Sequence, residues 1–181
     1  MKRKIIAIGG VPGSGKTTLV KNFMEGYSWV ECKPSKLIVS MYNKDNDLHI
    51  FGSYKDEEIY AGTDRLSMAV QPEIKKWITN ESFNFIFEGD RLFNSTFLEF
   101  LKTLNCDLYI VFLKCKDEVL KRRYSQRGSN QSSTFLKGRW TKQRKLKFNF
   151  KLMMDTFNFE NETVDDQFKI LDFLKTKMEL K

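Results

Sequence analysis

Residues 10–17 read GVPGSGKT and place three glycines, a lysine and a threonine at a spacing suited to phosphate chemistry. In the pattern G-x-x-x-x-G-K-[S/T], backbone N–H groups can surround phosphate oxygens because glycine has no Cβ to block their approach. The lysine neutralises the β- and γ-phosphates, and the threonine hydroxyl binds Mg²⁺. The segment therefore predicts a site for ATP and Mg²⁺ made by Gly10, Gly13, Ser14, Gly15, Lys16, Thr17 and Thr18.

The segments on either side of this loop fit the same role. Residues 4–9 are apolar and rich in β-branched side chains, which predicts a strand that is buried on both faces. Residues 18–24 are compatible with a helix, and the positive end of its dipole would lie close to the phosphates. A strand, a loop and a helix in this order are the context that the motif requires.

A second apolar run, residues 83–87, ends in the acidic residues Glu88 and Asp90. Ligands bind at the carboxyl edge of open α/β sheets, so we expect both carboxylates to lie beside the phosphates. An acid is needed there to position Mg²⁺. The alternative is that Asp90 pairs with its neighbour Arg91 in a solvated turn.

The rest of the chain continues the alternation of strands and helices. This alternation predicts an α/β fold, with a roughly five-stranded parallel sheet and helices on both faces, in a single domain of residues 1–181. In the last helix, which is amphipathic, we expect Phe168, Leu171 and either Leu174 or Lys175 on the buried stripe. The additional segments are two strands at residues 107–115 and 156–162 and two helices at residues 117–123 and 164–178.

Positive charge is concentrated between residues 122 and 147. This stretch has nine Lys and Arg and no acid, whereas the whole chain has 31 Lys and Arg, 23 Asp and Glu, and a net charge of +8. Outside the stretch, 22 cations (31 less 9) face 23 acids, so the remainder is close to neutral. We therefore expect a phosphate-bearing partner at this one place, and the surplus lysines leave room for a second polyanion.

Three motifs together resemble the P-loop kinases of the nucleoside-monophosphate-kinase type. They are the strand and loop that end at Lys16, the pair Glu88-Gly89 at the end of a strand, and the segment EVLKRRYSQRG. The resemblance implies a P-loop NTPase fold in which a basic lid, here about residues 127–139, closes over the transferring phosphate. The family pattern also favours Glu88 as the acid associated with the metal.

The resemblance assigns roles to arginines of the lid. Arg123 and Arg127 have the i,i+4 spacing of the pair that opens the lid, which implies that Arg123 contacts ATP and Arg127 the transferring phosphate. Arg139 and Arg144 would close the lid, with Arg139 as a catalytic residue and Arg144 on the acceptor side. Fixed guanidinium groups suit this reaction, because phosphoryl transfer depends on charge stabilisation and on the exclusion of water.

The acceptor side departs from ordinary mononucleotide kinases. Residues 36–66 contain two strand-like runs around the turn-forming NKDN, which predicts a β-hairpin insertion. The segment GTDRLS is similar to the Gly-Asp-x-Leu-Arg of mononucleotide kinases. By that similarity Arg65 contacts the acceptor phosphate, Asp64 orients or deprotonates the acceptor, and Arg91 lies on the same side. The alternative for Asp64 is a cap on the helix that follows.

The motifs GTDRLSMAVQP, FEGDRLF and RGSNQSSTFLKGR also resemble small phage-type P-loop kinases, among which are enzymes that phosphorylate 5-hydroxymethyluracil in DNA. We therefore expect phosphorylation of a 5-hydroxymethylpyrimidine base in DNA. Two other functions stay open: a deoxynucleoside-monophosphate kinase, and an ATP-regulated nucleic-acid-binding protein without transfer chemistry. The residues also leave open which of Asp64, Glu88 and Asp90 is the base and which is associated with Mg²⁺.

The composition indicates in which cellular compartment the protein acts and which kinds of partner and site it lacks. No apolar run approaches the roughly 20 residues that cross a bilayer, so no membrane partner is expected. Three cysteines without metal spacing suit a reducing cytoplasm, and the single histidine disfavours a histidine-based mechanism or metal site. The expected partners are a nucleoside triphosphate and an acceptor that is DNA or a nucleotide, and the sequence sets no oligomeric state.

Overall fold

The computed structural model describes residues 2–54, 61–126, 128 and 132–180. The strands are β1 (Arg3–Gly10), β2 (Val30–Ser35), β3 (Ile38–Asn43), β4 (Leu48–Phe51), β5 (Asn84–Glu88), β6 (Cys106–Lys114) and β7 (Thr156–Glu160). They form one sheet in the order β2-β3-β4-β5-β1-β6-β7. The five strands from β4 to β7 in this order are parallel, and β3 and β2 extend the sheet antiparallel.

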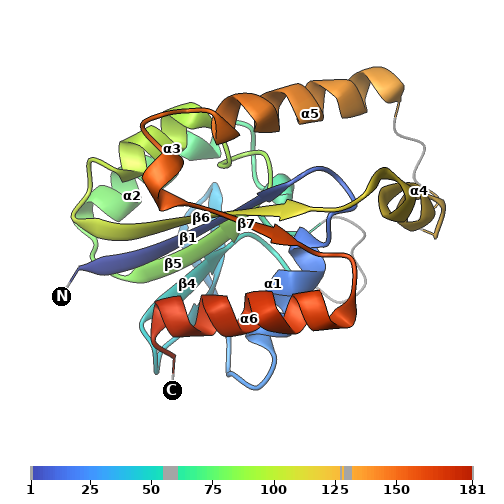
Figure 1. The fold of residues 1–181 in the computed structure, drawn as a ribbon. Coiled ribbons are helices and arrows are strands. Elements are labelled where there is room, and N and C mark those ends of the chain that lie inside the picture. Colours follow the sequence, from blue (N-terminus) through green and yellow to red (C-terminus); the bar gives the residue numbers. More distant parts are fainter. Residues whose placement is uncertain (1, 55–60, 127, 129–131, 181) are drawn as a thin grey trace.

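Helices cover both faces of this sheet (Figure 1). The helices are α1 (Lys16–Met24), α2 (Val70–Asn80), α3 (Ser95–Leu101), α4 (Asp117–Gln126), α5 (Ser133–Lys147) and α6 (Val164–Met178), with 3₁₀ turns η1 (Thr63–Arg65) and η2 (Met153–Asp155). Helices α1 and α6 pack on one face, and α2, α3 and α5 on the other. The predicted α/β fold is confirmed. None of these helices has the length and apolar character that a bilayer crossing requires, over the part of the chain that is described.

Strand β1 is the centre of the core because it pairs with β5 on one side and β6 on the other. Its side chains alternate between two apolar clusters: Ile5 and Ala7 pack with α2 and α3, and Ile6 and Ile8 pack with α1 and α6. All four are fully buried, as expected for a parallel strand covered on both faces. Each buried isoleucine stabilises the fold by roughly 1.5–3 kcal/mol. The loop after β1 is thereby fixed at the carboxyl edge of the sheet.

The predicted β-hairpin is confirmed, since β3 and β4 pair antiparallel. It is not a separate insertion, however, because β4 also pairs in parallel with β5 and so joins the main sheet. Strand β2 was not predicted. Its sequence VECKPS contains Pro34 and four exposed residues, so it lacks an apolar alternation, and proline is tolerated there because β2 lies at the edge of the sheet.

Helix α6 is confirmed with the predicted bounds, but the predicted buried stripe is partly wrong. Phe168 is 64% exposed, whereas Ile170, Leu174 and Met178 are buried at i, i+4 and i+8. The face that meets the sheet is set by tertiary packing, and both stripes were compatible with the 3.6-residue period.

The lid expected at about residues 127–139 is helical over part of its length. Helix α5 begins at Ser133, and the hydroxyl of Ser132 caps it by accepting a hydrogen bond from the Phe135 N–H (3.2 Å). Gly138 therefore lies inside a helix, at a cost of about 1 kcal/mol relative to alanine. Arg127, predicted to be catalytic, lies outside the described residues.

Candidate functional site

The loop between β1 and α1 folds around the side chain of Lys16. Gly13 and Gly15 have φ values of +78° and +89°, which only glycine adopts without strain. The Lys16 ammonium donates hydrogen bonds to the carbonyl oxygens of Gly10 (2.9 Å) and Val11 (3.3 Å). The cation is thus held against the loop whose backbone would surround a phosphate group.

Thr17 meets Glu88 directly beside this loop. The register that pairs Ile8 with Glu88 brings the ends of β1 and β5 together. The Thr17 hydroxyl then donates a hydrogen bond to Glu88 Oε1 (3.0 Å), and Glu88 is only 1% exposed. Burial raises the pKa of Glu88 from 4.5 to about 7, although the Lys16 ammonium opposes the shift. A carboxylate and a hydroxyl therefore share a dry position next to the phosphate loop.

The segment before α2 packs onto this carboxylate. The Thr63 hydroxyl donates a hydrogen bond to the Glu88 carbonyl (2.6 Å), and a Cβ on Gly62 would come within 2.3 Å of Glu88 Oε1. The Tyr54 hydroxyl is buried nearby, and within the described residues it has no hydrogen-bond partner. Burial raises its pKa well above 10, and the charges of Glu88 and Asp64 raise it further. Sequence reasoning missed Tyr54, which lies in no motif, and gave no role to Thr63, which lies within GTDRLS.

Asp64 does not cap the helix that follows, so that alternative is wrong. Helix α2 begins at Val70, and its N-cap Ala69 offers no side-chain acceptor. The Asp64 carboxylate instead accepts a hydrogen bond from the Asp90 N–H (3.0 Å), and its side chain is otherwise exposed. The segment expected on the acceptor side and the acidic end of β5 therefore meet.

Asp90 pairs with two cations of helix α5. The alternative, in which Asp90 pairs with Arg91, is therefore wrong. Arg139 Nη1 lies 2.7 Å from Asp90 Oδ2, and Lys142 Nζ lies 3.2 Å from Asp90 Oδ1. Arg91 instead donates to the Leu66 carbonyl (3.3 Å). Sequence reasoning left Lys142 unassigned, and its signal was only the i,i+3 spacing from Arg139 on one helix face. The Asp90 carboxylate thus binds two cations of α5 next to Asp64.

Arg123 lies behind the phosphate loop. Its guanidinium donates to the carbonyl oxygens of Gly13 (3.1 Å) and Asn161 (2.9 Å) and to Cys115 Sγ (3.1 Å). The neighbouring Tyr124 hydroxyl donates to the carbonyl oxygen of Pro12 (2.7 Å). Helix α4 therefore braces the loop from behind, and these donors of Arg123 point at protein acceptors.

The remaining predicted site residues are placed less centrally. Ser14 is buried, and its carbonyl oxygen accepts a hydrogen bond from the Asn161 amide (2.7 Å). Thr18 is exposed on the first turn of α1, and Arg65 is exposed on η1. Arg144 is exposed on α5, and five residues of helix turn it about 140° away from Arg139. The structure brings together Lys16, Thr17, Asp64, Glu88, Asp90 and Arg139.

The ligand atoms at this edge suit Mg²⁺ that is also bound by substrate phosphates and water. They do not suit a metal ion that protein side chains alone would hold. Thr17 and Glu88 offer hard oxygen ligands, whereas the described residues contain no group of three or more His, Cys, Asp or Glu that could hold a metal ion. Mg²⁺ in kinase sites uses one or two protein ligands and completes its shell with water and substrate phosphates.

Comparisons with known proteins agree with this fold. An unliganded sugar kinase from a Janibacter species is 12% identical with a TM-score of 0.54, and the alignment covers 98% of this chain and 95% of that one. A gluconokinase from Sinorhizobium meliloti is 18% identical with a TM-score of 0.50, covering 98% of both chains. An uncharacterised protein from Eubacterium ventriosum is 19% identical with a TM-score of 0.52, covering 99% and 100%. At these identities the similarity shows a shared fold.

A family model adds what structural similarity alone does not give. The model described as P-loop Nucleotide Kinase3 matches residues 1–156, which include the phosphate loop, Glu88, Asp90 and all of α5. The chain therefore belongs to the P-loop nucleotide kinase family and is a phosphotransferase.

Proposed function

We propose that this kinase transfers the γ-phosphoryl group of ATP, with Mg²⁺, to a hydroxyl group of a nucleic-acid-type acceptor. The favoured acceptor is a 5-hydroxymethylpyrimidine base in DNA. The observation that carries the proposal is the contact between Thr17 and buried Glu88 (3.0 Å) beside Lys16. A hydroxyl, a carboxylate and an ammonium group at one sheet edge are the parts that phosphoryl transfer needs.

On the ATP side, each residue has a physical task. Lys16 exchanges the carbonyl oxygens of Gly10 and Val11 for phosphate oxygens, which are stronger partners for an ammonium group. Thr17 and Glu88 would hold Mg²⁺, which neutralises phosphate charge when it is bound. Arg123 supports this side by fixing the loop at Gly13, and its contact with ATP stays a prediction.

On the acceptor side, Asp64 is the base in this proposal. Its carboxylate is exposed and oriented by the Asp90 N–H (3.0 Å), whereas Glu88 is buried against Thr17. Asp90 positions the cations of Arg139 and Lys142, which would stabilise charge on the phosphoryl group as it moves. Arg65 and Arg91 flank the same loop and supply positive charge toward the acceptor.

The charge on the outer side of α5 favours DNA as the acceptor. Lys137 and Arg144 are exposed there, away from the face that pairs with Asp90. The sugar–phosphate backbone of a polynucleotide extends on both sides of the reacting base and would give these cations phosphates to bind.

A deoxynucleoside-monophosphate kinase is the second candidate, and the description of the matching family model, a nucleotide kinase, favours it. In that case Arg65, Arg139 and Lys142 would bind the acceptor phosphate. An ATP-regulated binding protein without transfer chemistry is disfavoured, since the family consists of kinases.

The test uses ATP labelled on its γ-phosphate and three acceptors: DNA with 5-hydroxymethyluracil, the same DNA with thymine, and a panel of free deoxynucleoside monophosphates. We expect label on the hydroxymethylated DNA alone, and none with the Lys16→Ala variant. Label that appears only on free nucleotides would favour the second candidate. Label on none of them, at high enzyme concentration, would overturn the proposal.

A further inference from the structure

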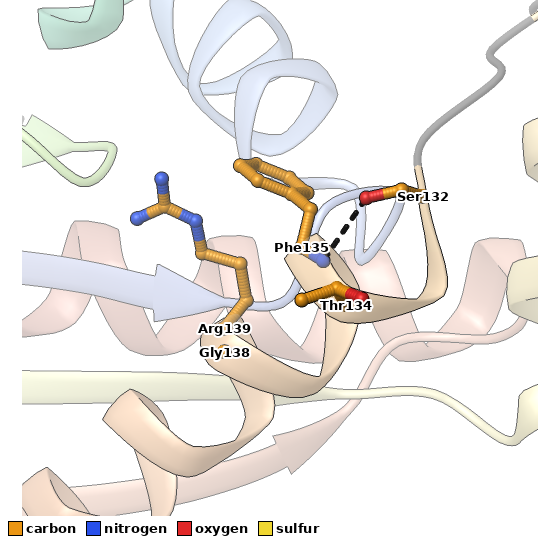
Figure 2. Close-up of a pocket in the computed structure, with 5 residues that line it drawn as sticks. All are labelled: Ser132, Thr134, Phe135, Gly138 and Arg139. Carbon is orange, nitrogen blue, oxygen red and sulfur yellow. Dashed lines mark hydrogen bonds between the residues drawn. The ribbon is translucent and has the colours of Figure 1, made fainter.

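A cavity of about 440 Å³ opens at the start of helix α5 (Figure 2). It is within the range of small-ligand sites, roughly 300–1,000 Å³. None of its side chains is acidic, whereas the edge beside the phosphate loop carries Asp64, Glu88 and Asp90. The lining residues are Ser132, Thr134, Phe135, Gly138 and Arg139.

Phe135 presents an aromatic surface to this cavity. Phe135 and Arg139 are four residues apart, so both extend from the same side of α5, as Figure 2 shows. The Arg139 guanidinium carbon lies 4.6 Å from the centroid of the Phe135 ring, a cation–π contact that leaves the ring 40% exposed. The side chain is too exposed for a core residue, and a cation already orients it. The Phe135 ring therefore contacts the Arg139 guanidinium and keeps an exposed surface on which a second group can stack.

The cavity is tied to the acceptor side of the site. Arg139 contacts the Phe135 ring and also pairs with Asp90 (2.7 Å). The N–H of Asp90 in turn donates to Asp64, the proposed base. The ATP side is the phosphate loop, which Arg123 and Tyr124 of α4 contact. A group bound against Phe135 would therefore belong to the acceptor.

The cavity also has room beside the ring. Gly138 lies between Phe135 and Arg139 along the helix, and a Cβ added there would meet nothing within 4 Å. A glycine inside a helix is less stable than alanine there, so the unobstructed surface at this position comes at a cost to helix stability. A flat ligand can approach Phe135 along this open side.

We propose that the cavity binds the planar heteroaromatic base of the acceptor, stacked on Phe135. The inference rests on the proposed function and specifies how that site recognises its substrate. A base offers a π face to the ring and to the Arg139 guanidinium, whereas a sugar acid or another non-aromatic hydroxyl compound offers none. Phe135 therefore selects aromatic acceptors and is not required for binding ATP.

Substitutions at Phe135 test this selection in steady-state kinetics. Phe135→Leu keeps an apolar side chain but removes the π face, and Phe135→Tyr keeps the π face. We expect Leu to raise the KM of a base-containing acceptor about tenfold, the equivalent of one stacking contact of roughly 1.4 kcal/mol. The KM of ATP should stay unchanged, and Tyr should restore the acceptor KM. Phe148→Leu, at an exposed phenylalanine that ends the same helix, is the matched control and should change neither constant.

Two kinetic outcomes would overturn the inference. In one, Phe135→Leu leaves the acceptor KM unchanged. In the other, the KM of ATP rises instead, which would place adenine and not the acceptor base on Phe135.

A binding measurement keeps this inference separate from the proposed function. Protein carrying a ¹⁹F-labelled phenylalanine at position 135 is titrated with thymidine and, separately, with gluconate, both without ATP. Stacking predicts a ring-current shift of the ¹⁹F signal with thymidine and no shift with gluconate. No shift with thymidine would overturn the inference whether or not the protein is active. A shift in a protein that phosphorylates no acceptor would overturn the proposed function and leave only the stacking of a base on Phe135 standing.

Discussion

Glu88→Gln should make the protein more stable at alkaline pH while it abolishes transfer. Glu88 is fully buried and its pKa is raised from 4.5 to about 7 by burial. Glutamine has a similar shape, and its amide oxygen can still accept the hydrogen bond of the Thr17 hydroxyl. The substitution therefore removes the charge and preserves the packing.

The pH dependence follows from the two protonation states. Below pH 4.5 the carboxyl group is protonated in the folded and the unfolded protein, so it contributes nothing. Between pH 4.5 and 7 the unfolded chain loses a proton that the folded protein keeps, so stability falls as pH rises. Over this window, at about 1.36 kcal/mol per pH unit, the loss totals about 3 kcal/mol and stays constant above pH 7.

Urea unfolding of both proteins at pH 5 and pH 8 measures the difference. Between these two values, wild type should lose about 2–3 kcal/mol relative to Glu88→Gln, because some of the effect is already present at pH 5. In a protein of this size that corresponds to roughly 5–10 °C in Tm. If the two proteins respond to pH in parallel, Glu88 titrates as an ordinary surface carboxylate and the proposed role at the metal loses its basis.

Three further predictions concern neighbouring residues. Lys16→Ala should reduce transfer below detection in an assay with labelled ATP, because the ammonium group that neutralises the phosphates is gone; turnover within tenfold of wild type would contradict this. Arg139→Ala should lower kcat far more than it weakens ATP binding, since its partner charge develops during transfer, and equal losses in calorimetric affinity and in kcat would argue against that role. Gly62→Ala should lower both Tm and kcat, because its Cβ would lie 2.3 Å from Glu88 Oε1 at a backbone φ of +73°; a variant as stable and active as wild type would refute the close packing.

Much of the fold could be predicted because its signals are local. The glycines and lysine of residues 10–17 and the apolar run before Glu88 each lie within one short segment. The parallel register then needed only the rule that strands of an α/β sheet end at one edge. Strand β2 could not be predicted in this way, because an exposed edge strand with a proline has no pattern of buried residues to detect.

The parts that could not be predicted depend on contacts between distant segments. The resemblance assigned Arg123 to ATP, and it gave no sign that this side chain also contacts Gly13, 110 residues away, and Asn161, 38 residues away. The pair of Asp90 with Arg139 and Lys142 requires α5 to cross over the end of β5, which no local pattern encodes. Spacing on a helix shows which residues share a face, but it does not show what that face meets.

Calorimetric titration of the wild-type protein with ATP, with and without Mg²⁺, tests the central claim most directly. The contact between Thr17 and Glu88 beside Lys16 predicts saturable binding of ATP that weakens when Mg²⁺ is withheld and again in Lys16→Ala. If neither Mg²⁺–ATP nor Mg²⁺–GTP binds to the wild-type protein, this edge of the sheet is not a nucleotide site and the proposed function is wrong.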